Sequence, residues 1–448
     1  MKKLTLVLLA FWFNATMAFA GDVVALSWEQ VVDVGLKQNL ELKILKQDIK
    51  NQKFNVYKSI SDFLPTVNYS FQAVNNVELP VLVFMGNRFR IGTKYNFTHA
   101  LQLQYPLFLG GARLANFSIQ RHARKSLLQM LKGKEQEVAF KAIEAYYQVM
   151  LSNDLLRVNQ KAWAAAKANF EQVEKFYQAG TASQLDFLRA KARLSQTIPA
   201  LTSAKNKLQM SQENLKFILN LAAEDSIVIL DSLVVKHFWP ALKKKSLAEL
   251  QTIALQSRPD LKSLEHQKTM SSRQKWIAGS RFVPQVVLTA NVQHQAFLEK
   301  ANVTAKDYTR SKAAGVVIQW PLFEGAKRVF ELQQSFIQSK KMELQQEQLR
   351  KAILLEVKNS YHQFQEAEQN LVSLEAAFQE AQETLRLADL MYKEGVSTQV
   401  EVLNAQTAFI NAELSYRKGI FDYNISQLRL LKAIGQLQVL WQSSESRN

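Results

Sequence analysis

The sequence predicts an α+β protein in which a membrane β-barrel continues into a long α-helical barrel. Three observations support this fold class: an N-terminal leader typical of exported chains, a tandem repeat of the order helix-strand-strand-helix, and heptad patterns far longer than a globular core needs. Each copy of the chain supplies only about four candidate strands, so several copies have to close the barrels together.

The first residues have the features of a secretory signal. Lys2 and Lys3 precede a short apolar run, and Ala18-Phe19-Ala20 fits an A-x-A cleavage site. We therefore expect a signal peptide at 1–20 and a mature chain that starts at Gly21. The sequence contains no cysteine, so we expect neither a disulfide framework nor a thiolate metal site, and no lipid anchor on a cysteine at the cleavage site.

The formal net charge of +17 at pH 7 is strongly basic. In a cytosolic protein such a charge would favour nucleic-acid binding. Here the basic residues are scattered along predicted helices among Gln and Glu, and an exported chain rarely meets nucleic acid. We therefore expect no nucleic-acid partner.

The mature chain contains two related halves. Gly35–Lys43 parallels Ala254–Lys262, and each half begins with a predicted helix that ends at a proline. The first of these should be a helix from Ser27 to about Ser61. We expect the following organisation: a first repeat at 21–220, a linker or equatorial segment at 221–245, a second repeat at 246–435 and a polar C-terminal tail at 436–448.

After Pro65 and Pro284 the hydrophobic period changes from that of a helix to two, which is typical of strands. The alternation fits a lipid-facing barrel, and it would also fit half-buried strands of a soluble sheet. The aromatic-proline pairs Tyr105-Pro106 and Trp320-Pro321 stand at strand ends, as in an interfacial belt, and favour the barrel. The four predicted strands cover about 66–77, 94–105, 285–297 and 312–320.

Long helices follow each pair of strands. From about Arg113 to Gln178, a helix would be about 100 Å long at about 1.5 Å per residue. Counting back by sevens from Tyr177 and from Tyr392 meets a sustained heptad of apolar and small residues, which predicts helices packed as a coiled coil. A returning helix completes each hairpin, and Pro199 predicts a kink or a junction between two helices in the first of them.

The two coiled-coil hairpins turn at apices predicted at 178–184 and 393–399. Both apices share the pattern Tyr-x-x-Gly-x-x-Ser/Thr-x-x-acid. Gly180 and Gly395 stand where a helix end requires a positive φ. The residue pairs that fit a capping box at the start of the returning helices are Ser183 with Asp186 and Thr398 with Glu401.

An open sheet of four strands is unstable in lipid, because each unpaired edge N–H or C=O group costs several kcal/mol. A head-to-tail contact that closes into a ring removes these edges. Three copies would give a barrel of about twelve strands, within the known range. We therefore expect a homotrimer, with the helices forming a tube that continues the barrel.

Together, the leader, the duplicated order of elements, the strand-ending aromatic-Pro-Leu-Phe-x-Gly motif and the apex pattern resemble the TolC-type outer membrane efflux protein family. The resemblance covers almost the whole mature chain. It implies a homotrimeric conduit in outer-membrane lipid that extends into the periplasm. The implied partners are a periplasmic adaptor and an inner-membrane pump, either an RND-type proton-driven transporter or an ABC transporter, which supplies the energy.

The resemblance also implies a periplasmic gate at the apices. Tyr392 and Asp186 match positions at which a hydrogen bond between helices constrains the closed state, and Glu401 matches an acidic ring that lines the constriction. Two positions depart from the family pattern. Asn404 stands in place of a second acidic ring, and Ser397 stands where some members have a gate arginine.

The residues alone allow a simpler interpretation. Asp186 and Glu401 lie in first helical turns, where carboxylates complement the helix dipole, so they could serve only as caps. Tyr392 and its counterpart Tyr177 could be only the last members of the heptads. Capping and gating are compatible with each other.

No motif indicates an enzyme. The sequence has no P-loop, no Rossmann glycine pattern and no G-x-S-x-G, and its histidines lack the spacing of zinc ligands. We expect no catalytic site, no metal and no cofactor. The preferred function is a passive exit duct of a tripartite efflux or type I secretion system. The alternative is a periplasmic coiled-coil scaffold without a conducting lumen.

Overall fold

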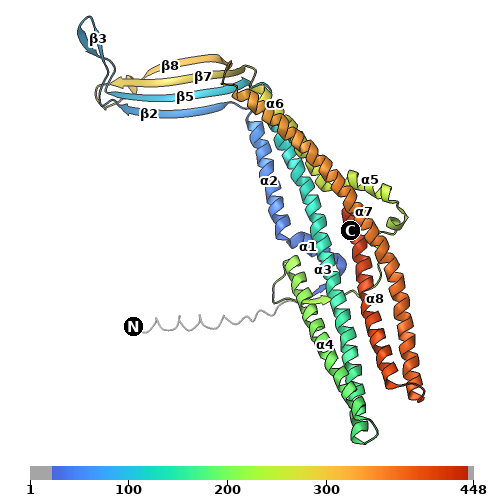
Figure 1. Cartoon of the computed structure of the whole chain (residues 1–448). Coiled ribbons are helices and arrows are strands. Elements are labelled where there is room, and N and C mark those ends of the chain that lie inside the picture. The colour runs from blue at the N-terminus through green and yellow to red at the C-terminus, as the bar shows by residue number, and fades with distance from the viewer. Residues whose placement is uncertain (1–22, 442–448) are drawn as a thin grey trace, which may run out of the picture. The chain divides into compact units, whose positions relative to one another are not determined.

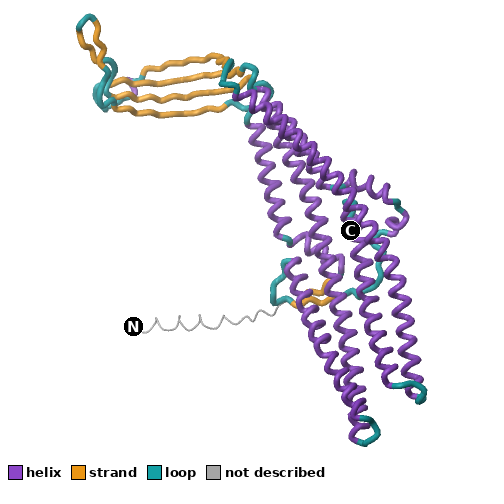
Figure 2. The backbone as a smooth tube through the Cα atoms, in the orientation of Figure 1, coloured by secondary structure: helices purple, strands orange, loops and turns teal. Residues whose placement is uncertain are grey.

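The structure is a computed structural model that describes residues 23–441. The predicted signal peptide at 1–20 and the part of the predicted tail beyond 441 lie outside these residues. The described chain forms two compact units, and helices make up most of it (Figure 2). Among residues 23–441, no helix is both long enough and apolar enough to cross a membrane.

The helical unit comprises the described residues up to 46, those at 130–260 and those from 349 onward, and the sheet unit comprises 47–129 and 261–348. Each unit therefore contains residues of both predicted repeats, since the longest helices continue from one unit into the other. The boundaries that we expect for the two repeats remain a prediction.

The sheet unit is built on a four-stranded antiparallel sheet in the order β2-β5-β7-β8 (Figure 1). Within the described residues, β2 and β8 are the edges of this sheet, so each pairs on one side only. The strands are β2 (Thr66–Asn75), β5 (Tyr95–Phe108), β7 (Gln285–Leu298) and β8 (Thr309–Gln319).

The two aromatic-proline pairs differ in their placement. Tyr105-Pro106 lies inside β5 rather than at its end, and the pairing of β5 with β7 is irregular between Pro106 and Phe108. Proline has no N–H to donate, so it is tolerated in a strand where the ladder is locally disrupted. Trp320 and Pro321 directly follow β8, and the indole N–H of Trp320 donates to the carbonyl of Phe282 at 3.2 Å.

The strand register aligns the apolar residues of all four strands on one face of the sheet, because residues paired across strands point to the same side. Val67 lies opposite Leu103, Leu103 opposite Ala290, and Ala290 opposite Ala314. Neighbouring rows add further apolar side chains to this face: Tyr105, Leu288 and Val316, then Val286 and Ile318.

The opposite face of the sheet is polar but uncharged. Because side chains alternate along a strand, it receives the residues between those of the apolar face. None of the side chains that the four strands place on this face is acidic or basic. Its polar residues include Ser70, Gln72, Thr98, Gln102, Gln104, Thr289, Asn291, Gln293, Gln295 and Ser311.

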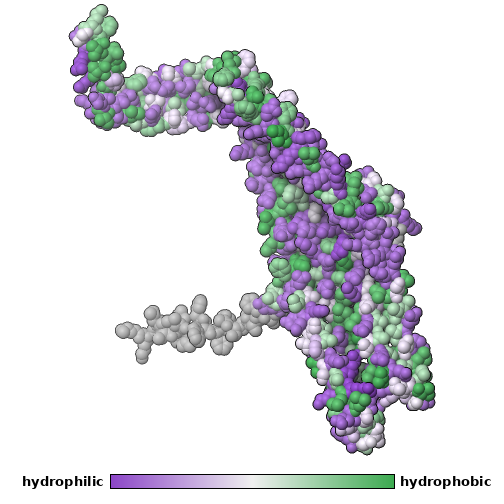
Figure 3. Space-filling model, in the orientation of Figure 1, coloured by the Kyte–Doolittle hydropathy of each residue, from purple (hydrophilic) through white to green (hydrophobic). Residues whose placement is uncertain are grey.

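The connection between β2 and β5, where the sequence predicted no strand, contains a further two-stranded hairpin. It consists of β3 (Val81–Phe84) and β4 (Asn87–Arg90), and every residue in both strands is exposed. All four residues of β3 are hydrophobic, whereas β4 contains Asn87, Arg88 and Arg90, and the hairpin shows both hydrophobic and hydrophilic surface in Figure 3. The connection between β7 and β8 contains a short 3-10 helix, η2 (Ala305–Asp307).

The prediction of one helix from Ser27 to Ser61 is wrong, because the chain breaks at Asn39. The side-chain oxygen of Asn39 accepts the backbone N–H of Leu42 at 3.1 Å, so this residue starts a new helix. In the second repeat the equivalent break falls at Arg258, which the following Pro259 biases away from the α conformation. The two breaks have nearly the same backbone angles, with φ −57° and ψ 125° at Asn39 and φ −59° and ψ 123° at Arg258. The resulting helices are α1 (Trp28–Gln38), α2 (Leu40–Ser61), α5 (Leu247–Ser257) and α6 (Pro259–Ser280).

Four long helices form two hairpins, α3 with α4 and α7 with α8 (Figure 1). Pro199 lies inside a continuous α4, so the predicted junction between two helices is absent there; proline removes only one intrahelical hydrogen bond. Several heptad positions are buried within one chain, including Ala142, Val149, Val173, Ile353, Val357, Phe364 and Leu371. The helices are α3 (Ala112–Gln178), α4 (Gln184–Leu219), α7 (Lys327–Lys393) and α8 (Gln399–Ala433).

The linker packs onto the helical unit through a parallel strand pair, β1 (Val23–Leu26) with β6 (Ser226–Ile229), and the 3-10 helix η1 (Pro240–Lys244) follows. The hydroxyl of Tyr146 lies 2.9 Å from the carbonyl of Leu26 and 2.9 Å from the carboxylate of Asp231. These contacts fix β1 and the segment that follows β6 to α3. The beginning of the predicted tail is packed as well, since Leu437 is completely buried.

Candidate gate at the helical apices

Both apices turn through the same backbone motif. At the end of α3, Gly180 has φ +77°; its N–H donates to the carbonyl of Tyr177 at 3.0 Å, and the N–H of Thr181 donates to the carbonyl of Phe176 at 2.9 Å. At the end of α7, Gly395 has φ +75° and donates to Tyr392 at 3.1 Å. This pair of bonds is the Schellman motif, which requires the left-handed conformation that glycine adopts without strain.

The returning helices begin with similar but unequal caps. Ser183 accepts the N–H of Asp186 at 3.1 Å and donates its hydroxyl to the carboxylate of Asp186 at 2.6 Å. Thr398 accepts the N–H of Glu401 at 3.4 Å, and the carboxylate of Glu401 accepts the N–H of Thr398 at 3.2 Å. Only the second apex therefore has the reciprocal capping box.

Glu401 is the most strongly stabilised carboxylate of the predicted gate. The hydroxyl of Ser397 and the backbone N–H of Thr398 both donate to it, and these hydrogen bonds hold the pKa of Glu401 below its usual range. Asn404 lies one turn further along α8 and is exposed on the same face as Glu401. The predicted residues Ser397, Glu401 and Asn404 are thus grouped at one apex.

The two tyrosines of the apex pattern have different surroundings. The ring of Tyr177 stacks on Phe187 of the returning helix, with ring centroids 5.0 Å apart and an interplanar angle of 19°. Tyr392 is 44% exposed. Within the described residues of one chain, no hydrogen bond joins Tyr392 to Asp186, whose carboxylate instead contacts Ser183 and, at 3.8 Å, Arg189.

Two contacts between the hairpins escaped the sequence analysis. The guanidinium of Arg193 on α4 donates to the hydroxyl of Thr407 on α8 at 2.9 Å. The side-chain amide of Gln399 on α8 donates to the side-chain oxygen of Asn169 on α3 at 3.3 Å. Arg193 lies about two helical turns beyond Asp186 on the same face, and this periodicity is the only signal that could have identified it.

Further from the apex, an ionic cluster joins α3 to α8. The guanidinium of Arg417 lies 3.6 Å from the carboxylate of Asp154 and 3.8 Å from that of Glu413. Arg157 also pairs with Asp154, at 2.9 Å. Glu413 is only 7% exposed. Since a buried charge that loses its partner is strongly destabilising, this cluster constrains how the two helices can pack.

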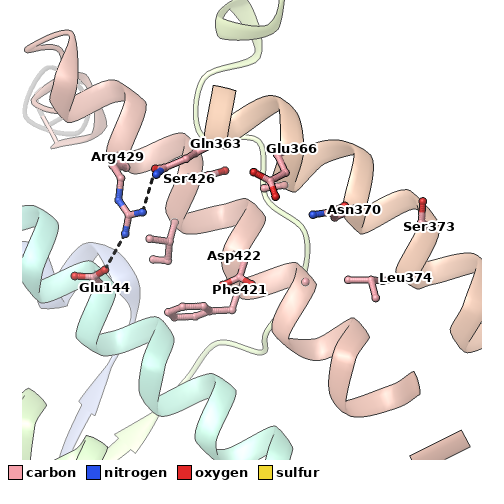
Figure 4. Close-up of a pocket in the computed structure, with 13 residues that line it drawn as sticks. Glu144, Gln363, Glu366, Asn370, Ser373, Leu374, Phe421, Asp422, Ser426 and Arg429 are labelled. Atoms are coloured by element: carbon pink, nitrogen blue, oxygen red, sulfur yellow. Dashed lines mark hydrogen bonds and ion pairs between the residues drawn. The ribbon is translucent and has the colours of Figure 1, made fainter. Parts of the chain in front are cut away.

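A groove of about 470 Å³ lies among α3, α7 and α8. Figure 4 shows Arg429 between Glu144 and Gln363, at 3.7 Å and 3.4 Å respectively. Burial raises the pKa of Asp422, which also lines the groove. Among the described residues, no group of three or more His, Asp or Glu side chains is arranged to hold a metal ion.

These features define a class of protein. Long paired helices with glycine-capped apices, joined to a few strands that are apolar on one face and polar on the other, are the elements of an outer-membrane channel protomer. A profile of the family described as "Outer membrane efflux protein" matches residues 32–221 and 250–436. The chain belongs to this family. It is a channel protein of the outer membrane and not an enzyme.

The relatives are distant but extend over most of the chain. The alkaline protease secretion protein AprF of Pseudomonas aeruginosa is 20% identical over 343 residues, which cover 75% of this chain and 69% of AprF. The outer membrane protein TolC of Salmonella enteritidis is 22% identical over 391 residues, which cover 82% of this chain and 77% of TolC. Among solved structures, the outer-membrane channel OprN superposes with a TM-score of 0.79 at 18% identity, covering 91% of this chain and 90% of OprN. The fold is therefore that of these channels.

Proposed function

We propose that the chain is the exit duct of a tripartite efflux or type I secretion system, and that it works as a homotrimer. In this proposal three four-stranded sheets close into one barrel of about twelve strands, and the coiled-coil hairpins form a tube in the periplasm. A periplasmic adaptor and an inner-membrane pump, of the RND or ABC type, deliver the cargo. The duct itself conducts passively.

The register of the sheet carries the proposal. The apolar residues of four strands share one face, and uncharged polar residues occupy the other. A soluble sheet would cover its apolar face with helices or a second sheet, whereas many residues of this face, such as Tyr69, Leu101 and Val316, are exposed. Lipid is the environment in which an uncovered apolar face is stable, and the polar face then lines a water-filled lumen.

The edges of the sheet support a closed assembly. β2 and β8 each present one unpaired row of backbone groups within the described chain. In lipid these groups must find partners, and the β8 edge of one copy can pair with the β2 edge of the next. A ring of identical contacts pairs the backbone groups of both edge strands in every copy, whereas a single copy leaves both edges unpaired.

The apices are the proposed gate. Glu401 is held ionised by Ser397 and Thr398, so three copies would place a ring of carboxylates at the narrow end and favour cations there. Asp186 and Tyr392 do not bond to each other within one chain, so in this proposal their contact forms between neighbouring copies or only in the closed trimer. The capping role of Asp186 and Glu401 is compatible with this function.

Two classes of cargo fit this function: molecules removed by efflux and secreted proteins. The family description names efflux, and the name of one relative refers to protease secretion. Both processes use the same duct design, so the pump determines the cargo.

The test is ion conductance of the purified full chain in planar lipid bilayers, with native mass spectrometry to count copies. We expect trimers with a small closed-state conductance that rises several-fold in the double variant Asp186→Ala, Tyr392→Phe. A monomer would contradict the proposal. A trimer that never conducts, even with both substitutions, would instead support the periplasmic scaffold.

A further inference from the structure

The charges of the sheet are few and are placed together. Across all four strands, the only formally charged side chains are those of Arg310 and Lys312 in β8. Both are basic. By the strand register, both point to the apolar face, where Arg310 lies opposite His294, and His294 lies opposite His99. A face that is otherwise apolar therefore carries a row of basic side chains near its outer end.

Two tyrosines hold the histidine of this row in place. Nδ1 of His99 lies 2.8 Å from the hydroxyl of Tyr69, and Nε2 of His99 lies 3.1 Å from the hydroxyl of Tyr308. Phe71 packs against the imidazole with ring centroids 4.6 Å apart. The basic rim is defined here as these tyrosines and the basic residues beside them: Tyr69, His99, His294, Tyr308, Arg310 and Lys312.

No acidic side chain of the described residues neutralises the two strong bases of the basic rim. Neither Arg310 nor Lys312 has an ion-pair partner in the part of the chain that the structure describes. The nearest carboxylate along the chain, that of Asp307, accepts the N–H and the hydroxyl of Thr304 at 2.7 Å each. The two positive charges are exposed and available for an external anion.

The basic rim lies toward the outer end of the apolar face, at the beginning of β8; on β5 and β7 two further apolar rows lie beyond it, Phe97 with Ala296 and Tyr95 with Leu298. From Ile318, near the end of β8 that leads into α7, to Arg310 is a distance of about 26 Å along the strand at a rise of about 3.3 Å per residue. Because barrel strands are tilted by about 40°, this distance corresponds to about 20 Å along the barrel axis, and the lipid-facing band of an outer-membrane barrel is about 25 Å tall. The basic rim therefore lies in the outer part of this band, close to the level at which hydrocarbon gives way to headgroups, at the end of the sheet away from the helices.

We propose that the basic rim binds the phosphate groups of lipids in the outer leaflet. The proposal rests on the function proposed above, since it requires the apolar face to be in contact with lipid. Arg310 offers a planar pair of donors that fits a phosphate, Lys312 adds a compact charge, and the Tyr and His side chains add neutral hydrogen-bonding groups. Bases are costly at the centre of a lipid-facing strand and are tolerated near its ends, so their placement here fits a phosphorylated headgroup.

The experiment measures lipid retention by the full chain purified in detergent, with native mass spectrometry. The probes are bisphosphorylated lipid A, the same glycolipid without phosphates, and inorganic phosphate as a competitor. The test variant is Arg310→Gln with Lys312→Gln. The matched control is Lys300→Gln with Lys306→Gln, which removes the same charge from the adjacent connection between β7 and β8.

We expect the test variant to bind the bisphosphorylated lipid about ten-fold more weakly or worse, because it loses one or two charge-assisted hydrogen bonds. The control variant should bind within about two-fold of the unmodified chain, on the scale of screened surface charges. The glycolipid without phosphates should bind weakly to every variant. If the double variant does not fold, the single substitution Lys312→Gln gives the same comparison.

Three results would overturn the proposal: unchanged binding in the test variant, an equal loss in test and control variants, or full displacement of the lipid by millimolar inorganic phosphate. Conductance is measured in parallel on the same preparations and should not differ between the test variant and the unmodified chain. A chain that binds the lipid and does not conduct would contradict the exit-duct function alone, so the two failures are distinguishable.

Discussion

The acids at equivalent positions of the two apices form different contacts. Glu401 reaches back to the N–H of Thr398 and also accepts the hydroxyl of Ser397, whereas Asp186 reaches only the hydroxyl of Ser183 and approaches Arg189. The repeat in the sequence thus predicts where the two acids lie, while the side-chain conformation of each acid determines what it bonds.

The cap of α8 can be tested directly. Thr398→Ala removes the hydroxyl that accepts the N–H of Glu401, and we expect a loss of about 1 kcal/mol of local stability. Amide hydrogen exchange in the first turn of α8 should accelerate several-fold. Thr398→Ser keeps the hydroxyl and serves as the control. Unchanged exchange in the alanine variant would show that water replaces the cap without cost.

A histidine pair in the sheet unit predicts a pH dependence. Nδ1 of His122 lies 3.3 Å from Nδ1 of His266. Burial lowers the pKa of His122, and the charges of His266 and Lys125 lower it further; burial and Lys125 likewise lower the pKa of His266. Since the folded state disfavours the protonated rings, the unfolded chain binds more protons below its own histidine pKa of about 6.5. Stability should therefore fall as the pH drops below that value and stay constant above it.

The measurement is the thermal midpoint at pH 8 and at pH 5.5. His122→Gln should reduce the difference between the two midpoints, because it removes one of the titrating rings. His362→Gln serves as the control, since His362 is exposed on α7 and is bonded to neither ring. Equal midpoint differences in both variants would assign the pH dependence to other groups.

At the scale of whole elements, long periodic segments were predictable and local interruptions were not. The heptads of α3 and α7, and the alternation in β2 and β7, are repeated signals that add up over many residues. The break at Arg258 has a signal in Pro259, but the equivalent break at Asn39 depends on one side chain turning back to its own backbone. Every residue of β3 and β4 is exposed. The hairpin therefore has no alternation of buried and exposed positions from which its strands could be predicted.

The junction between strand and helix offers a matched pair of glycines. Gly110 has φ +61° and Gly325 has φ +62°. A Cβ atom at Gly110 would lie 2.6 Å from Val283 and 2.8 Å from the carbonyl of Ser280, whereas a Cβ atom at Gly325 would meet nothing within 4 Å. We expect Gly325→Ala to cost about 1–2 kcal/mol through its backbone conformation alone. Gly110→Ala should cost about 1–3 kcal/mol more, because of the clash.

Thermal unfolding of the two alanine variants, side by side, measures this difference. The shared backbone penalty cancels between them, so the remaining gap reports the close approach of Val283 and Ser280. Equal midpoints would mean that the connection between α6 and β7 moves aside at no cost.

The contact between Arg193 and Thr407 joins the two hairpins near the proposed gate. Arg193→Ala removes one hydrogen bond, which is worth roughly 1 kcal/mol, and should raise the open fraction of the channel several-fold. Conductance of single channels in planar bilayers measures this fraction. Lys191→Ala, an exposed substitution on the same helix, should leave the open fraction unchanged. An effect of similar size in both variants would indicate a general loss of charge rather than a specific contact.

At the scale of the whole molecule, the sequence predicts that other copies are needed and does not predict the contacts between them. Counting strands shows that one chain cannot close a barrel. Tyr392, however, is 44% exposed and forms no bond to Asp186 within one chain, so its role depends on how neighbouring copies are arranged around it. For this reason the gate residues remain a proposal although the fold of the channel family is established.

The absence of cysteine in all 448 residues permits a clean test of assembly. Ser70 in β2 and Ser311 in β8 occupy opposite edges of the sheet in the same row, about 14 Å apart at about 4.8 Å per strand. This distance is too long for a disulfide within one chain. With cysteines at both positions, a short bifunctional cross-linker should yield covalent dimers and trimers. Cysteines at Ala100 and Gln293, which pair directly within the sheet, should yield cross-linked monomers, and monomers from both variants would contradict a closed ring.

The polar face of the sheet has a consequence for what can leave through the outer mouth. Asn, Gln, Ser and Thr offer hydrogen bonds but no net charge, so a throat lined by them neither attracts nor repels ions of either sign. In this proposal, only the diameter of the lumen would limit which molecules pass through the barrel. Selection by charge would then depend on the other end of the duct, where the carboxylates of Glu401 would converge in the proposed trimer.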